Sequence, residues 1–151
     1  MKRTAIHLSI ILLFLSGLFF SCEKEIRSSI PDFEVFIETS PSEFAMLQTI
    51  MIPVTYTPDK PVSATFRLGY GGVLIFRDFD KKVRSFDLAC PVEVSRNTRV
   101  EIDMPFAVCP VCNSKFDLSW GFASPVAGPA KEPLRAYRNV FERANSYVVQ
   151  N

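Results

Sequence analysis

Short apolar and alternating segments recur between residues 33 and 150, separated by Gly, Pro and Asp turns. Alternation is typical of half-buried strands, and a short continuous apolar run is typical of a fully buried one. The segments that we predict to be strands are residues 33–38, 50–56, 72–77, 83–88, 99–103, 106–108 and 146–150. Pro53 indicates that the second of them is an edge strand. The only predicted helix is residues 41–48, with Ser40 as its N-cap.

This series of short strands predicts an all-β domain, an antiparallel sandwich or barrel. Residues 22–30 are polar and charged and are predicted to be a tether. Residues 31–151 contain no repeat and no second boundary, so we expect one domain with a modest core.

The first 21 residues have a different pattern. Lys2 and Arg3 precede an apolar run at residues 5–20, and no acidic residue occurs before Glu23. A bilayer span needs about 20 apolar residues, so this run is short for a membrane helix and suits the apolar part of a removable signal.

The apolar run ends at Ser21 and Cys22, which resembles the lipobox of bacterial lipoproteins. The resemblance implies that residues 1–21 are removed and that Cys22 is acylated. The protein would then be held by membrane lipid in the bacterial cell envelope, outside the cytoplasm, on either the inner or the outer membrane. The alternatives are an uncleaved N-terminal anchor and an ordinary secretory signal, and both also take the chain out of the cytoplasm.

Removal of the signal changes both the charge and the available chemistry. Lys2 and Arg3 leave with it, so 15 of the 17 basic residues stand against 16 acidic ones. A nearly neutral chain without a basic stripe does not favour nucleic-acid binding. His7 is the only histidine and is also removed. A mature protein without imidazole has no Ser-His-Asp triad, no Cys-His dyad and no histidine-ligated metal.

Three cysteines follow Cys22 in two short motifs. The first is Cys90-Pro91-Val92, and the second is Cys109-Pro110-Val111-Cys112. The set resembles the Rieske iron–sulfur domain family, in which Cys-x-His is followed after 16 or 17 residues by Cys-x-x-His. Here sixteen residues separate Val92 from Cys109, so all four ligand positions match in spacing. Val92 and Cys112 replace the two histidines.

The resemblance extends over roughly residues 30–151. Its further elements are Phe116, Gly121, the segment Gly128-Pro129-Ala130, which is similar to the family's proline loop, and Leu134 with Tyr137 behind it. It implies a larger antiparallel base built from the N- and C-terminal strands. It also implies a small subdomain at about residues 88–125 that carries both cysteine loops.

The altered ligands change what the resemblance implies about cofactors. In Rieske domains two histidines hold one of the two irons and raise its potential. Val92 has no donor atom and the mature chain has no histidine, so we expect no histidine-ligated cluster and predict no cofactor.

Several uses of the thiols are then open. An exported protein meets an oxidising compartment, so we rank first a disulfide from Cys90 to Cys109 or Cys112. The resemblance favours Cys90–Cys109, because those positions share one iron in the family. A metal site ranks second, with the three thiolates and a carboxylate such as Glu93 around zinc or an atypical iron–sulfur cluster. Thiol redox catalysis at the CxxC motif ranks third, because no helix N-terminus is predicted there.

Two classes of function follow. The first is a non-enzymatic scaffold or binding module on a Rieske-like domain without its cluster. The second is an electron-transfer or metal-binding protein with a site at Cys90, Cys109 and Cys112. We predict no catalytic residue, and the sequence indicates no protein or small-molecule partner beyond the lipid at Cys22.

Overall fold

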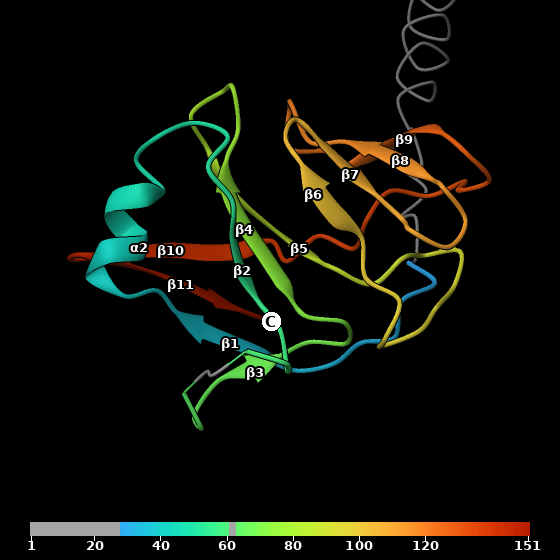
Figure 1. Cartoon of the computed structure of the whole chain (residues 1–151). Coiled ribbons are helices and arrows are strands. Elements are labelled where there is room, and N and C mark those ends of the chain that lie inside the picture. The colour runs from blue at the N-terminus through green and yellow to red at the C-terminus, as the bar shows by residue number, and fades with distance from the viewer. Residues whose placement is uncertain (1–27, 61–62) are drawn as a thin grey trace, which may run out of the picture.

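The structure, a computed structural model, describes residues 28–60 and 63–151 and confirms the all-β prediction. It consists of three antiparallel sheets and one short helix, and the sheets of the described part do not close into a barrel (Figure 1). The predicted signal, Cys22 and most of the predicted tether lie outside the described residues. No helix within the described ranges is long and apolar enough to cross a membrane.

Two of the sheets form what we call the base. The first has the strand order β10-β11-β1-β3, and the second has the order β2-β4-β5. Their bounds are β1 Val35–Glu38, β2 Val54–Tyr56, β3 Arg67–Leu68, β4 Val73–Arg77, β5 Val83–Asp87, β10 Asn139–Arg143 and β11 Ser146–Gln150. Because β1 pairs with β11, with Ile37 opposite Val149, the two ends of the domain are joined in one sheet.

The third sheet is inserted between β5 and β10. Its order is β6-β7-β8-β9, and its strands are β6 Glu101–Asp103, β7 Phe106–Val108, β8 Lys115–Asp117 and β9 Ser124–Ala127. In Figure 1 it lies beside the base, and the segment after β9 leads back to the base, where Ala136 forms a bridge with Phe86 of β5.

Strand β4 explains why residues 73–76 are all apolar. Leu74 and Phe76 pack into a core shared with the inserted sheet, whereas Val73 and Ile75 pack into the core of the base. A strand that is buried on both faces needs no polar alternation. The continuous run read from the sequence is therefore a central strand between two cores.

The helix α2, Pro41–Met46, confirms the helix prediction and ends two residues earlier than expected. The Ser40 side chain accepts from the backbone N–H of Glu43, and the Glu43 carboxylate accepts from the N–H of Ser40. This capping box satisfies two donors that the first turn would leave without partners.

Some strand predictions differ from the structure. The predicted strand at 50–56 is reduced to β2 because Met51 lies in a turn with φ 59°. Strands β3, β8, β9 and β10 were not predicted. Each of these is short or has a weak apolar pattern, so pairing with neighbouring strands decides its conformation.

Candidate metal centre

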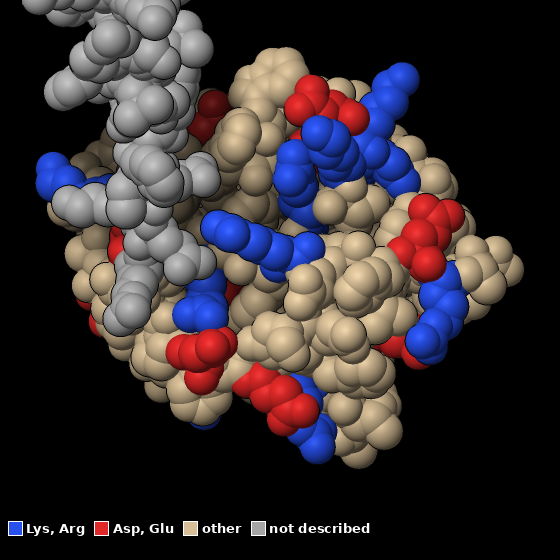
Figure 2. All heavy atoms as spheres, turned by 180° about the vertical axis from the view of Figure 1, so that it is seen from behind, with Lys and Arg blue, Asp and Glu red and all other residues tan. Residues whose placement is uncertain are grey.

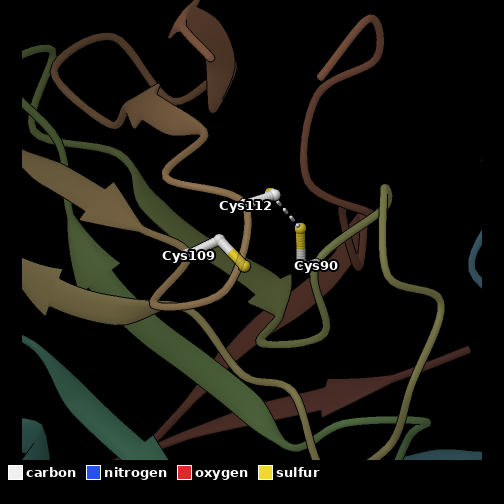
Figure 3. Close-up of side chains that lie close together, drawn as sticks. All are labelled: Cys90, Cys109 and Cys112. Carbon is white, nitrogen blue, oxygen red and sulfur yellow. Dashed lines mark hydrogen bonds between the residues drawn. The ribbon is translucent and has the colours of Figure 1, made fainter. Parts of the chain in front are cut away.

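The three cysteines come together from two loops that are distant in the sequence. Cys90 lies in the loop between β5 and β6, and Cys109 and Cys112 lie in the loop between β7 and β8. Figure 3 shows the three side chains pointing toward one another. We call them the cysteine site. Their sulfur atoms all lie within 4.8 Å of one another.

The thiols are close but not bonded. The Sγ atoms of Cys90 and Cys112 are 3.6 Å apart, and all three cysteines are free. A disulfide bond is about 2.05 Å long. Cys90 and Cys109 are buried and Cys112 is partly exposed, so the site lies just below the surface. The predicted disulfide stays a prediction.

Backbone hydrogen bonds hold the Cys90 loop closed. The N–H of Val100 donates to the carbonyl of Leu88, and the N–H of Cys90 donates to the carbonyl of Thr98 over 3.2 Å. The start of the loop lies against the glycine turn before β4, where a Cβ on Gly71 would be 2.7 Å from the backbone nitrogen of Ala89. Only glycine permits this approach.

Asp87 connects the Cys90 loop to the base. Its buried carboxylate accepts from the backbone N–H groups of Tyr70, Gly71 and Ala89. It also accepts from the Tyr137 hydroxyl. Burial, followed by the negative charge of Asp87, raises the pKa of Tyr137 above its ordinary value. Four donors from three segments therefore meet at one carboxylate, three residues before Cys90.

A third loop covers the cysteine site through Ser114. The N–H of Ala130 donates to Ser114 Oγ over 3.1 Å, and Ser114 is fully buried. Gly128 has φ +83°, and a Cβ on it would lie 2.5 Å from Ser114 Cα, so only glycine lets this loop approach so closely. The Sγ of Cys112 is 3.1 Å from Ser114 Oγ.

The local environment gives two of the thiols different acidities. Burial raises the pKa of Cys90 to about 12, although the backbone N–H groups of Glu93 and Val92 oppose the shift. Burial also acts to raise the pKa of Cys112, but hydrogen bonds with the Ser114 hydroxyl and backbone and with the other two thiols outweigh it. The pKa of Cys112 is therefore lowered. A bound divalent cation would deprotonate coordinating thiols outright.

Comparisons with known proteins do not assign the chain to a family. No protein-family model matches it, and no curated protein matches it. The chemistry of the site is therefore argued from its own donors.

The donor set does not fit a histidine-ligated iron–sulfur cluster. Val92, at one of the two histidine positions of the resemblance, has no donor atom and is 41% exposed. A cluster with two irons also places the thiolates of different irons at opposite ends of its core. Three sulfurs within 4.8 Å of one another suit a single ion better.

The donor set does fit a single metal ion. With a Zn–S bond of about 2.3 Å, a tetrahedral site places its sulfurs about 3.8 Å apart. The 3.6 Å separation of Cys90 and Cys112 is close to this value. Glu93, the carboxylate considered with the three thiols, is not part of the group that the structure brings within 4.8 Å.

Sequence reasoning identified the three cysteines but did not identify Asp87 or Ser114 as residues that position them. Asp87 could have been noticed as an acidic residue in an otherwise apolar segment, Phe86-Asp87-Leu88. Ser114 gave no comparable signal, because a serine after a cysteine motif is ordinary in a turn.

The charged side chains on the surface do not indicate a particular function. On the face in Figure 2, acidic and basic side chains are interspersed, in several places side by side. This agrees with the nearly neutral composition. Several basic side chains lie next to one another in the upper middle of this view, with acidic side chains at their edge.

Proposed function

We propose that this chain is a metal-binding domain in which Cys90, Cys109 and Cys112 hold one thiolate-preferring divalent ion, with zinc as the first candidate. The observation that carries the proposal is the convergence of three free thiols within 4.8 Å of one another from two loops. Cysteine-rich tetrahedral sites are typical of structural zinc. In this role the ion would join the two loops and hold the inserted sheet against the base.

The proposal includes the Rieske-like ancestry of the domain. It is supported by the loop at residues 128–130, which lies over Ser114 as a proline loop would. It is also supported by the order in the chain of the segments that meet at the site, because the Cys90 loop, the loop of Cys109 and Cys112, and the loop at residues 128–130 follow one another as in the Rieske resemblance. Replacement of both histidine positions changes the chemistry from electron transfer at a two-iron cluster to binding of one ion.

A second candidate is a metal-free scaffold held by a disulfide. The contact between Cys90 and Cys112 favours it, because their sulfur atoms are only 3.6 Å apart. An exported protein meets the oxidising conditions in which such a bond persists.

Metal analysis together with thiol mapping separates the two candidates. The full chain is expressed with export and purified anaerobically without chelator. It is then analysed for zinc, iron and sulfide and mapped by peptide mass without reduction. We expect about one zinc per chain and thiols that become alkylated only after chelation. A disulfide between Cys90 and Cys112 without metal would establish the scaffold instead, and stoichiometric iron with sulfide would contradict both candidates.

We also propose that the protein is a lipid-anchored member of the bacterial cell envelope, because Cys22 directly follows a signal-like apolar run. Replacement Cys22→Ser removes the thiol that would be acylated, so we expect unprocessed precursor or release from the membrane. Fractionation with carbonate washing and immunoblotting measures this. A mutant that stays membrane-bound at the processed size would contradict the anchor.

A further inference from the structure

The two loops of the cysteine site share the sequence Cys-Pro-Val and the same backbone turn. Residues 90–94 read Cys-Pro-Val-Glu-Val, and residues 109–113 read Cys-Pro-Val-Cys-Asn. In each loop the N–H of the fifth residue donates to the carbonyl of the first, over 2.9 Å in the first loop and 3.0 Å in the second. The fifth residue has a positive φ in both, 45° at Val94 and 57° at Asn113.

Exposure matches at the first, third, fourth and fifth residues of the two turns and differs at the second, because Pro91 is buried and Pro110 is exposed. The first residue of each, Cys90 or Cys109, is buried. The third residue is exposed, by 41% at Val92 and by 60% at Val111. The fourth residue is Glu93 in one loop and Cys112 in the other, and both are partly buried. Glu93 therefore occupies the same position in its turn, three residues after Cys90, as Cys112 occupies after Cys109.

The turn at residues 90–94 requires a positive φ at Val94, a conformation that valine rarely adopts. Asparagine tolerates a positive φ, whereas a β-branched residue such as Val94 is a true outlier there. Strained backbone of this kind persists where the surrounding structure demands it and is concentrated at ligand-binding sites. The surrounding structure therefore maintains a strained turn in which Glu93 has the position that Cys112 has in the other turn.

We propose that Glu93 is the fourth ligand of the metal site, so that one ion is bound by a Cys-x-x-Glu turn and a Cys-x-x-Cys turn. The inference rests on the proposed function and specifies its ligand set. A carboxylate oxygen is an accepted zinc ligand, at about 2.0–2.2 Å. The ion pairs among the described residues all use other acidic groups, so none of them holds the Glu93 carboxylate.

In the proposed site the side chain of Glu93 moves toward the sulfurs. Its carboxylate is outside the group of atoms that lie within 4.8 Å of one another. Its backbone N–H helps to oppose the rise in the pKa of the Cys90 thiol. Rotation about the three side-chain bonds can bring the carboxylate toward the sulfurs while the turn keeps its shape.

Cobalt titration tests the ligand set. The full chain, in detergent and in reducing, chelator-free buffer, is titrated with Co²⁺ and then competed with Zn²⁺. The visible d–d bands report tetrahedral geometry, and the thiolate-to-cobalt charge-transfer band reports the number of thiolates. The variants are Glu93→Gln, Glu93→Cys and, as the matched control, Glu101→Gln, whose carboxylate is exposed on β6.

We expect Glu93→Gln to weaken Co²⁺ and Zn²⁺ binding at least about tenfold, since even loss of an outer-shell partner costs about that much. Glu101→Gln should bind like the parent chain. Glu93→Cys should retain tetrahedral binding and raise the charge-transfer intensity by about a third, as four thiolates replace three. Circular dichroism of each metal-free variant checks that the fold is intact.

Two results would overturn the inference while leaving the proposed function standing. One is parent-like affinity and spectra for Glu93→Gln, because a water would then be the fourth ligand. The other is weakened binding in both Glu93 variants without the added charge-transfer intensity in Glu93→Cys. In that case Glu93 would stabilise the turn but would not bind the metal. A parent chain that binds no Co²⁺ would overturn the proposed function itself.

Discussion

The base and the inserted part of the molecule are stabilised by different means. In the base, strands of up to five residues pair in continuous register and enclose an aliphatic and aromatic core. In the inserted sheet, three strands have only three residues and the fourth has four. Its loops are held by the Asp87 carboxylate, the Ser114 hydroxyl and the group of three thiols.

This difference indicates a division of roles. The free energy gained from hydrophobic burial is proportional to the apolar area removed from water. The core of the base contains no residue of the inserted sheet, so this part of the stability does not depend on the insert. The inserted part contributes buried residues such as Phe116 and Leu118 to the shared core. Its long loops depend in addition on specific polar contacts and, in our proposal, on a metal ion. The following predictions test that division, from the largest expected effect to the smallest.

The largest effect is expected at the junction of the two parts. Replacement Asp87→Ala removes the acceptor of four donors in a buried position. We expect the free energy of unfolding to fall by about 3–5 kcal/mol, the range for buried groups that lose a charged partner. Denaturant unfolding followed by circular dichroism measures it. The control Asp80→Ala, at an exposed position, should change it by less than about 0.5 kcal/mol. If the two substitutions lowered the free energy of unfolding equally, Asp87 would not stabilise the contact between the base and the Cys90 loop.

A core substitution in the base should separate stability from metal binding. Ile37 is fully buried in β1, and Ile37→Ala should lower the free energy of unfolding by about 3 kcal/mol through lost burial and a residual cavity. Because Ile37 packs only in the core of the base, the folded variant should bind Co²⁺ with parent affinity. A matching loss of affinity would mean that the two parts do not behave independently.

Metal removal should affect mainly the inserted part. At metal concentrations about a hundredfold above Kd, binding adds about 2.7 kcal/mol to stability, and a chelator removes that contribution. We expect faster hydrogen exchange at residues 88–100 and 109–114, with protection of β4 and β11 nearly unchanged. Exchange measured by mass spectrometry with and without chelator decides this. Equal loss of protection in both parts would refute a local role for the ion.

The smallest effect concerns pH in the metal-free protein. The lowered pKa of Cys112 and the pKa of about 12 for Cys90 predict that Cys112 is alkylated before Cys90. Above an ordinary thiol pKa of 9.0, Cys90 ionises in the unfolded chain while the folded chain keeps its proton. Its contribution to stability is complete below pH 9.0 and is lost as the pH rises toward about 12.

Alkylation rates followed by peptide mapping, together with unfolding at several pH values, test the pH prediction. The Cys90→Ala variant is the control, because it removes the raised thiol and should flatten the decline in stability. A chain in which Cys90 reacts before Cys112 would contradict the described environment of the site.

Much of the fold could be predicted from local patterns. The apolar run at residues 72–77, the segment at residues 83–88 and the capped helix each appeared close to their predicted bounds. Their signals lie within a few residues of one another and reflect burial on fixed faces. The weaker strands were missed because their conformation depends on partners elsewhere in the chain, as in β10, which pairs residue by residue with β11.

For the candidate site, the sequence by itself determined the chemistry that is available: three thiols, no imidazole in the predicted mature chain, and a carboxylate at Glu93. Only the tertiary structure decided how those groups are arranged. Which thiols meet, which carboxylate anchors the loop and which hydroxyl faces Cys112 all depend on contacts between distant segments. The turn that residues 90–94 and 109–113 share was determined partly by the sequence and partly by the tertiary structure. Its repeated Cys-Pro-Val is visible in the sequence, but the positive φ at Val94 is maintained by the surrounding fold, because no local preference of valine would produce it.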